Sequence, residues 1–233
     1  MRPMDQASFT IIGLGGLGTP LALALAASGA RRLVLVDDDV VDLSNLQRQV
    51  LYRTEDVGRP KGVAAKEALI RRGVPASRIE VARVRFNSAS ARGLLHDSDV
   101  ACDGSDNLQT KFLVNDACVA VGRRFVIAGV VQDHGQVFPV RPGHDACYRC
   151  LFEAPPAEEI ATCAEAGVLG ATCGHVAAIA ARAAMALAMG EDPKGILGKA
   201  WLIEAGTPRS IVLRPRPDCQ ACGIEFSEKE NQA

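Results

Sequence analysis

The stretch FTIIGLGGLGTPLALALAASGARRLVLVD, residues 9–37, decides the fold class of this protein. It begins with a short apolar strand at 9–12, turns through a glycine-rich loop, and continues in an apolar helix from about Thr19 to Ser28. It ends in a second strand, 32–37, that contains the continuous apolar run LVLV. Helices and strands that are apolar on nearly every side are typical of a parallel sheet covered on both faces. The stretch therefore predicts the first strand–helix–strand unit of a Rossmann-like, doubly wound α/β fold.

The same alternation continues to about residue 130 and then changes. The further strands that the pattern predicts are 78–86, a strand within 99–106, 125–131, 136–140, 199–205 and 209–215. The further helices that it predicts lie within 58–73 and at 88–97, 108–122 and 172–189. Because only a few residues separate 125–131 from 136–140, these two strands should pair antiparallel. We therefore expect a mostly parallel sheet with a C-terminal antiparallel extension.

The composition and net charge of the chain bear on which kinds of partner it binds. The 233-residue chain is 48% hydrophobic and 23% charged and has a formal net charge of −1, which gives no electrostatic reason to expect nucleic acid or a membrane surface as the main partner. We expect no apolar run of membrane-spanning length. The opening MRPMDQAS lacks a signal-peptide type of segment, so the expected compartment is the cytoplasm.

The glycine loop indicates a nucleotide. Gly13, Gly15 and Gly18 fit the dinucleotide-binding pattern, in which glycines give a tight turn and let the backbone approach phosphate. Gly16 adds a further position in the loop without a side chain. Asp37 ends the second strand, where it can accept hydrogen bonds from ribose hydroxyls. This signal alone also fits a nicotinamide or flavin cofactor, or a glycine turn without a ligand.

The segment SNLQRQ, residues 44–49, favours a nucleotide whose phosphates react. Asn45 and Arg48 are one helical turn apart and share a face, and the forked guanidinium of Arg48 suits phosphate oxygens. Lys61 begins the next helix, where the helix N-terminus already favours anions. A dehydrogenase needs no arginine at this point, apart from one that binds a 2′-phosphate.

The segment DGSDN places Asp103, Asp106 and Asn107 at the carboxyl end of another parallel strand. Ligands bind at this edge in doubly wound folds, and carboxylates beside phosphates are typical of Mg²⁺ sites. The alternative is a set of solvated loop acids with a surface arginine.

Eight cysteines in a chain of this kind indicate metal ligands or reactive thiols rather than a disulfide scaffold. Two C-x-x-C pairs supply the four thiolates of a tetrahedral structural zinc site: Cys147, Cys150, Cys219 and Cys222. The alternatives are a redox pair or inert thiols. Cys163 lies in a loop near a helix start, where a thiol can become nucleophilic. Cys102, Cys118 and Cys173 fall on predicted strands and helices and are expected in the core.

Taken in order, the motifs GLGGLG, DDDVVDLSNLQRQ, VGRPK, SDN, CYRC, TCAEAGVLG and CQACG resemble those of the ubiquitin-activating-enzyme-like adenylyltransferases. The most similar branch is the MoeB/ThiF/HesA type, which activates sulfur-carrier proteins for molybdopterin and thiamine biosynthesis, and the resemblance covers about residues 9–223. It implies binding of ATP and Mg²⁺. It also implies attack on the α-phosphate by the C-terminal glycine carboxylate of a small ubiquitin-fold sulfur-carrier protein ending in Gly-Gly, with acyl-adenylate and pyrophosphate as products.

The resemblance also assigns residues. Those expected to bind the nucleotide are Gly15, Gly16, Asp37, Asp39, Asn45, Arg48, Gln49, Lys61, Asp106 and Asn107. Those expected to act in the reaction are Arg48, Lys61, Asp106 and Cys163, and in related enzymes the equivalent of Cys163 can attack the adenylate or carry a persulfide. The family's N-terminal helix lends an arginine to the neighbouring subunit of a homodimer, whereas Arg2 is the sole arginine before the first strand here.

We expect one adenylyltransferase domain over 1–233. Its expected parts are a nucleotide-binding core at 9–130 and a zinc-stapled carrier-binding part at 131–223. A crossover loop at 152–170 lies within the second part, and a polar tail follows at 224–233. Other functions that fit are activation of a peptide carboxylate or a tRNA-base carboxylate by the same family, a nicotinamide-dependent oxidoreductase, and a non-catalytic binding protein.

Overall fold

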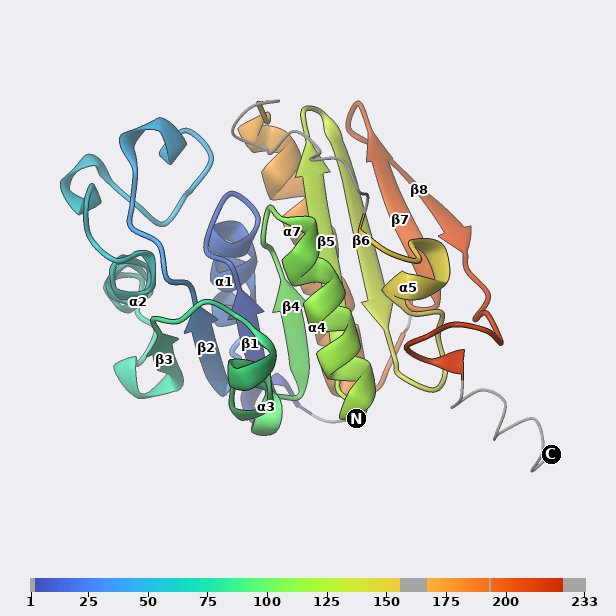
Figure 1. Cartoon of the computed structure of the whole chain (residues 1–233). Helices are drawn as coiled ribbons and strands as arrows, with labels where there is room; N and C mark the ends of the chain where they lie inside the picture. The colour runs from blue at the N-terminus through green and yellow to red at the C-terminus, as the bar shows by residue number, and fades with distance from the viewer. Residues whose placement is uncertain (1–2, 156–166, 193, 224–233) are drawn as a thin grey trace.

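The computed structural model describes residues 3–155, 167–192 and 194–223. Its described strands form a single mixed sheet (Figure 1). Its strand order is β3-β2-β1-β4-β5-β6-β7-β8. The strands are β1 (Ser8–Ile12), β2 (Arg32–Val36), β3 (Ile79–Ala82), β4 (Val100–Asp103), β5 (Arg124–Val131), β6 (His134–Val140), β7 (Lys199–Glu204) and β8 (Thr207–Val212). The strands from β3 to β5 pair parallel and those from β5 to β8 pair antiparallel, so the predicted fold class is confirmed.

Helices cover both faces of this sheet, with α4 in front and α7 behind in Figure 1. The helices are α1 (Gly18–Ala27), α2 (Lys61–Arg71), α3 (Ser88–His96), α4 (Leu108–Ala120), α5 (Tyr148–Leu151) and α7 (Gly170–Met189). Successive residues of a strand point to opposite faces, so Leu33 and Leu35 join the core under α1, α2 and α7. Val34 and Val36 join the second core under α3 and α4.

Two expectations about elements need correction. The predicted strand 78–86 ends at Ala82, because its neighbour β2 ends at Val36, the partner of Ala82, and β3 is an edge strand with no second neighbour. The expectation that no apolar run is long enough to span a membrane is also wrong. Helix α7 has 20 residues and a mean hydropathy of 1.4, but 67% of that stretch is buried inside the protein, as expected for a central core helix.

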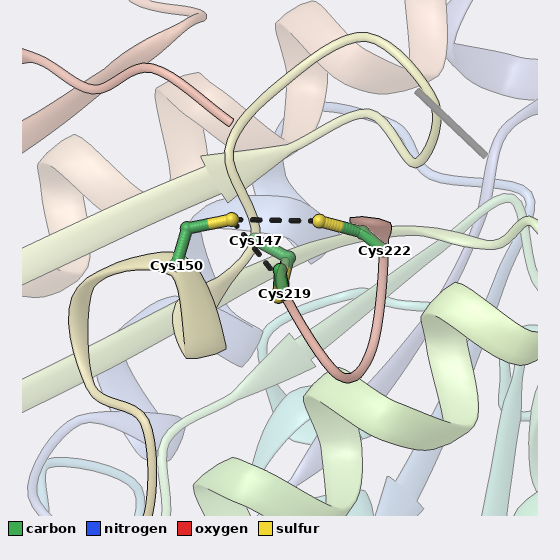
Figure 2. A group of neighbouring side chains, drawn as sticks. All are labelled: Cys147, Cys150, Cys219 and Cys222. Atoms are coloured by element: carbon green, nitrogen blue, oxygen red, sulfur yellow. Dashed lines mark hydrogen bonds between the residues drawn. The ribbon is translucent and has the colours of Figure 1, made fainter. Parts of the chain in front are cut away.

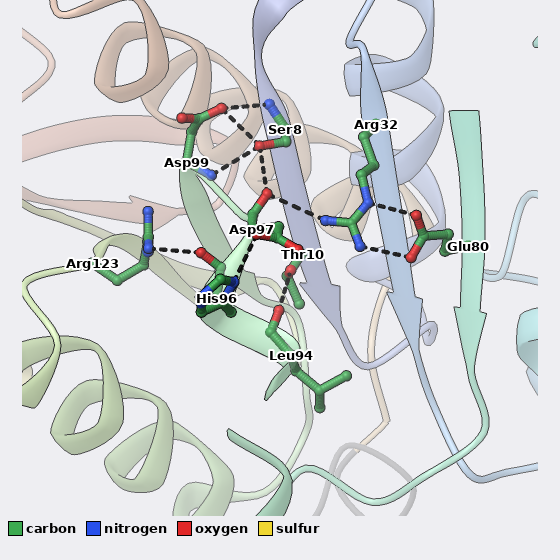
Figure 3. A network of polar contacts seen from close by, with 9 residues as sticks. All are labelled: Ser8, Thr10, Arg32, Glu80, Leu94, His96, Asp97, Asp99 and Arg123. Atoms are coloured by element: carbon green, nitrogen blue, oxygen red, sulfur yellow. Dashed lines mark hydrogen bonds and ion pairs between the residues drawn. The ribbon is translucent and has the colours of Figure 1, made fainter. Parts of the chain in front are cut away.

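A network of polar groups joins neighbouring segments at the amino-terminal edge of the parallel strands (Figure 3). The Ser8 backbone N–H and hydroxyl donate to Asp99 Oδ2 over 2.8 and 2.7 Å. Arg32 binds both carboxylate oxygens of Glu80 at 2.6 Å and also donates to the backbone carbonyl of Asp97. These contacts tie the starts of β1, β2 and β4 to one another. Arg32 and Glu80 are therefore matched to each other within the protein.

Candidate active site

The glycine loop follows β1 at the carboxyl edge of the sheet. Gly13 has a φ of +82°, and a Cβ there would lie 2.9 Å from the backbone nitrogen of Ser105. A Cβ at Gly18 would lie 1.8 Å from the Gly13 carbonyl oxygen. Neither position tolerates a side chain, because the loop turns tightly on itself and packs backbone to backbone on the segment after β4. The predicted role of these glycines in shaping the loop is consistent with this packing.

Asp37 is joined to the glycine loop directly. Its carboxylate accepts from the backbone N–H of Leu14 at 2.6 Å and from that of Asp39 at 2.8 Å. Burial raises the pKa of Asp37, while the Lys61 ammonium and these two backbone donors oppose the rise. Each carboxylate oxygen keeps a further lone pair, so Asp37 is placed to accept from a ligand hydroxyl next to the loop.

Tyr52 also holds the loop, and sequence reasoning missed it. Its hydroxyl donates to the Leu14 carbonyl oxygen at 2.9 Å, and the residue is almost fully buried. Burial raises the pKa of this phenol, so Tyr52 remains a neutral donor. Its place within an apolar run of the sequence gave no signal of a polar role.

Arg48 lies over the glycine loop. Its Nη2 donates to Asn45 Oδ1 at 2.5 Å, as the one-turn spacing of these residues predicted. A Cβ at Gly16 would lie 3.2 Å from both Cγ and Cδ of Arg48, so the stem of the arginine runs across Gly16. The absence of a side chain at Gly16 therefore lets a forked cation lie close to the loop backbone.

Gln49 presents a buried acceptor beside the same loop. The residue is 3% exposed, its Nε2 lies 3.9 Å from the position of a Cβ on Gly15, and its Oε1 has no hydrogen-bond partner among the described residues. A buried polar atom without a partner costs free energy, and a ligand donor would satisfy it. Together with the glycine cradle, this atom fits a polar ligand at the loop.

Lys61 brings a second cation to this edge. Its side chain is 9% exposed, and its Nζ lies 2.8 Å from Oδ2 of Asp39, whose side chain is 72% exposed. The backbone N–H of Lys61 also donates to the Asp39 carbonyl at 3.0 Å, which fixes the start of α2 against the loop after β2. The cation is therefore held at the mouth of the site by an acid that solvent or a ligand can reach.

The loop after β4 completes the arrangement. Asp106 is exposed, whereas Asn107 caps α4 by accepting from the Thr110 N–H at 2.7 Å. Asn107 thus caps a helix in the structure, and its expected contact with the nucleotide stays a prediction. Buried Lys111 was missed: its Nζ contacts Asp103 Oδ2 at 2.9 Å and the carbonyls of Ser105 and Ala128 at 2.8 and 2.6 Å.

The structure thus brings residues from three strand ends to one edge of the sheet. The direct contacts among them link Asp37 to the glycine loop, Arg48 to Asn45 and Gly16, and Lys61 to Asp39. Arg2 and Cys163 lie outside the described residues, so their expected roles stay predictions.

The four cysteines of the two C-x-x-C pairs come together as predicted (Figure 2). Their sulfur atoms all lie within 4.8 Å of one another, with separations of 3.9 Å for Cys147 and Cys150, 3.6 Å for Cys147 and Cys219, and 3.4 Å for Cys150 and Cys222. Four sulfurs at about 2.3 Å from a tetrahedral ion are about 3.8 Å apart. The cluster therefore fits a metal ion bound by four thiolates.

Contacts around this cluster act on the Cys150 thiol and fix the position of the first cysteine pair. The thiols of Cys147 and Cys222 and the N–H of Arg216 hydrogen bond to the Cys150 sulfur, which lowers the pKa of Cys150. Tyr148, next to the first cysteine, donates its N–H to Asn115 of α4 at 2.7 Å. The turn that carries the first two cysteines is thus fixed to α4.

The other described cysteines are buried, as predicted. Burial raises the pKa of Cys102 and Cys118, which keeps both thiols neutral. Cys173 is 1% exposed, but it also approaches the glycine loop: a Cβ at Gly16 would lie 3.1 Å from its Sγ.

The fold places the protein in the doubly wound α/β class, and it also carries a cluster of four cysteines that could hold a metal ion. The family model described as "ThiF family" matches residues 1–223, and the chain belongs to this family. The resemblance drawn from the sequence motifs is thereby confirmed.

Relatives support the same placement. The chain is 39% identical over 235 residues to the sulfur carrier protein adenylyltransferase of Thermus thermophilus, covering 97% of this chain and 86% of that protein. It is 43% identical over 224 residues to the adenylyltransferase and sulfurtransferase MOCS3 of Sus scrofa, covering 94% of this chain and 49% of that protein. The chain therefore spans about half the length of MOCS3.

Solved structures share the fold. The crystal structure of E. coli MccB with ATP superposes with a TM-score of 0.81 at 22% sequence identity, covering 94% of this chain and 68% of that one. At this level of identity the likeness concerns the fold.

Proposed function

We propose that this protein uses ATP to adenylate the C-terminal glycine carboxylate of a small ubiquitin-fold sulfur-carrier protein. The observation that carries the proposal is the stem of Arg48 lying across Gly16, at the loop that would hold the phosphates. A relative that this chain covers over 86% of its length is named a sulfur carrier protein adenylyltransferase, and the relatives of similar identity named MOCS3 are also adenylyltransferases.

The reaction follows from the positions of the charges. Asp37 accepts from the ribose, and the glycine loop faces the phosphates. A carboxylate oxygen of the carrier bonds to the α-phosphorus as the bond to the bridging oxygen breaks, and pyrophosphate leaves with that electron pair. Arg48 and Lys61 stabilise the charge that develops on the leaving group, so the protein works by positioning and electrostatics without a covalent intermediate.

Mg²⁺ would be held by the carboxylate of Asp106 at the rim of the site, where it would neutralise phosphate charge. Asp39 is placed to release Lys61 when phosphates arrive, because its side chain is the exposed partner of that buried cation. Asn45 would keep the guanidinium of Arg48 oriented, and the unpaired Gln49 Oε1 would accept from the nucleotide.

The remaining parts complete the proposal. The four cysteines would hold a structural Zn²⁺, since four protein ligands leave no open position for a reacting group. We assign residues 9–130 to the nucleotide and 131–223 to the carrier, and we assign the protein a homodimeric state. Adenylate formation has no step that needs a thiol, so Cys163 would act after adenylation, in transfer of sulfur or of the acyl group.

Activation of a peptide carboxylate is less well supported. It rests on the fold shared with MccB, one of whose structures is described as a complex with MccA. Two relatives, with 39% and 43% identity, are instead named for a sulfur carrier or for sulfur transfer.

Carrier-dependent ATP–pyrophosphate exchange tests the proposed function. We expect exchange with a ubiquitin-fold carrier ending in Gly-Gly and none with the same carrier lacking its last glycine. Exchange should persist in Cys163→Ala and collapse in Asp106→Ala. Exchange without any carrier, or its loss in a folded Cys163→Ala protein, would contradict the assignment.

A further inference from the structure

The first turn of α7 lies against the backbone that carries Arg48. Gly170 is the first residue of this helix, and a Cβ there would lie 2.8 Å from the carbonyl oxygen of Gln47. The same Cβ would lie 3.7 Å from the Cα and Cβ of Arg48. Because the nearest atom belongs to the backbone, it cannot move aside as the end of a flexible side chain would. The close approach therefore depends on glycine at this position.

Backbone hydrogen bonds to the turn between β5 and β6 also fix the start of α7. The N–H of Leu169 donates to the Gln132 carbonyl at 3.2 Å, and the N–H of Gln132 donates to the Gly167 carbonyl at 3.1 Å. Gln132 lies at the turn between β5 and β6, so the helix start is tied to the sheet. A side chain at Gly170 would therefore push the Arg48 segment rather than the helix.

Arg48 thus lies between two glycines, Gly16 and Gly170. Its stem runs across Gly16, and its backbone faces Gly170. Cys173, one turn further along α7, reaches the same glycine loop with its sulfur. The backbone and stem of Arg48 are accordingly packed between the first turn of α7 on one side and Gly16 on the other.

From these contacts we infer that Gly170 is a positioning residue for Arg48, and that the start of α7 fixes where this cation meets the phosphates. The inference rests on the proposed role of Arg48 in adenylation. A displacement of about 1 Å of a reacting or stabilising group can cost on the order of 100-fold in rate. We expect Gly170→Ala to lower kcat for exchange by about 10- to 100-fold, with a much smaller change in the KM for the carrier.

Gly174 offers a matched control in the same helix. Apart from its chain neighbours and the nearby backbone of its own helix, no atom of the described residues lies within 4 Å of the position of its Cβ, and neither glycine has a positive φ. Alanine is a better helix former than glycine, so both substitutions favour the helix itself. Gly174→Ala should keep wild-type exchange and a melting temperature at or above that of the wild type. A difference between the two variants then isolates the contact with the Gln47–Arg48 backbone.

A double variant tests whether Gly170 acts through Arg48. Arg48→Lys keeps a cation but loses the fork, and we expect the loss caused by Gly170→Ala to shrink severalfold or vanish in that background. An equal loss in both backgrounds would show that Gly170 acts elsewhere and would overturn the inference. Wild-type exchange in Gly170→Ala would overturn it as well, while leaving the proposed function intact.

A second measurement does not depend on the carrier. The rise in melting temperature caused by ATP with Mg²⁺ should fall in Gly170→Ala and in Arg48→Lys, fall no further in the double variant, and stay unchanged in Gly174→Ala. If wild type shows this rise but no carrier-dependent exchange, the proposed function fails and the positioning of Arg48 is still tested. An unchanged rise in Gly170→Ala, with a reduced one in Arg48→Lys, would contradict the inference.

Discussion

The two edges of the parallel sheet use the same kinds of charged residue in opposite ways. At the amino-terminal edge, Arg32 donates to both carboxylate oxygens of Glu80 and to a backbone carbonyl, so each of its three guanidinium nitrogens donates within the protein. At the carboxyl edge, the hydrogen bond that the structure describes for the Arg48 guanidinium goes to Asn45, and the stem of this arginine runs across the glycine loop. A charge matched inside the protein indicates structure, whereas a charge held in place with donors to spare indicates binding.

The largest expected effect on stability is at the cysteine cluster. Because this cluster lies at neither edge of the parallel sheet, a substitution there tests stability without changing the proposed nucleotide site directly. Cys219→Ser removes one of four ligands, and binding of a structural zinc contributes directly to folding. We expect about one zinc per chain in the wild type, loss of it in the variant, and a much lower melting temperature. Elemental analysis and thermal unfolding measure both effects. A metal-free wild type with four freely reactive thiols would disprove the zinc site.

Lys111→Met should give the next largest effect, by leaving buried Asp103 without its cation. Breaking one side of a buried ion pair costs about 3–5 kcal/mol. For a domain of this size, that corresponds to a fall on the order of 10 °C in melting temperature. The double variant Lys111→Met with Asp103→Asn removes both charges and should recover part of the loss. Equal stability of the two variants would show that the pair is not the source of the effect.

Arg48→Ala and Arg32→Ala compare the two edges directly. Arg48→Ala should lower carrier-dependent ATP–pyrophosphate exchange by about 10²- to 10³-fold, as for a single donor in a preorganised site. Arg32→Ala should leave exchange unchanged and reduce stability by about 0–1 kcal/mol, because its partner Glu80 is 53% exposed. Similar losses of exchange in both variants would remove the distinction between the edges.

Tyr52→Phe should have a small effect at the glycine loop. It removes one buried hydrogen bond to the Leu14 carbonyl, worth about 1 kcal/mol. The variant should fold, lose a few degrees in melting temperature, and bind ATP a few times more weakly, since the loop is less firmly held. Calorimetry and equilibrium titration provide the comparison, and an unchanged protein would show that the loop does not depend on this tyrosine.

Sequence reasoning predicted the features that local spacing encodes. Short motifs predict the glycines of the loop, the Asn45–Arg48 pair and each of the two cysteine pairs, because a helical turn or a C-x-x-C turn fixes the relative positions of their side chains. The meeting of the two cysteine pairs, 72 residues apart in the chain, followed from the four thiolates that a zinc ion binds. The strand at 78–86 was predicted too long, because its length depends on where β2 ends rather than on its own residues.

Contacts between distant segments were not predictable in this way. The contact of Lys111 Nζ with the Ala128 carbonyl and the contact of Gly170 with Gln47 depend on how close two segments come in the folded protein. Asn107 shows a different difficulty: the same residue type is suited to a helix cap and to a ligand contact, and its position at a helix start favours both.

The central claim is that the carboxyl edge of the sheet binds ATP, and thermal stabilisation by ligand tests it most directly. A ligand that binds only the native state at 100 times its Kd stabilises it by about 2.7 kcal/mol. We predict that ATP with Mg²⁺ raises the melting temperature of the wild type, that the rise is much smaller in Arg48→Ala and unchanged in Arg32→Ala, and that NAD gives none. A larger rise with NAD than with ATP, or an ATP effect lost in Arg32→Ala and kept in Arg48→Ala, would contradict it.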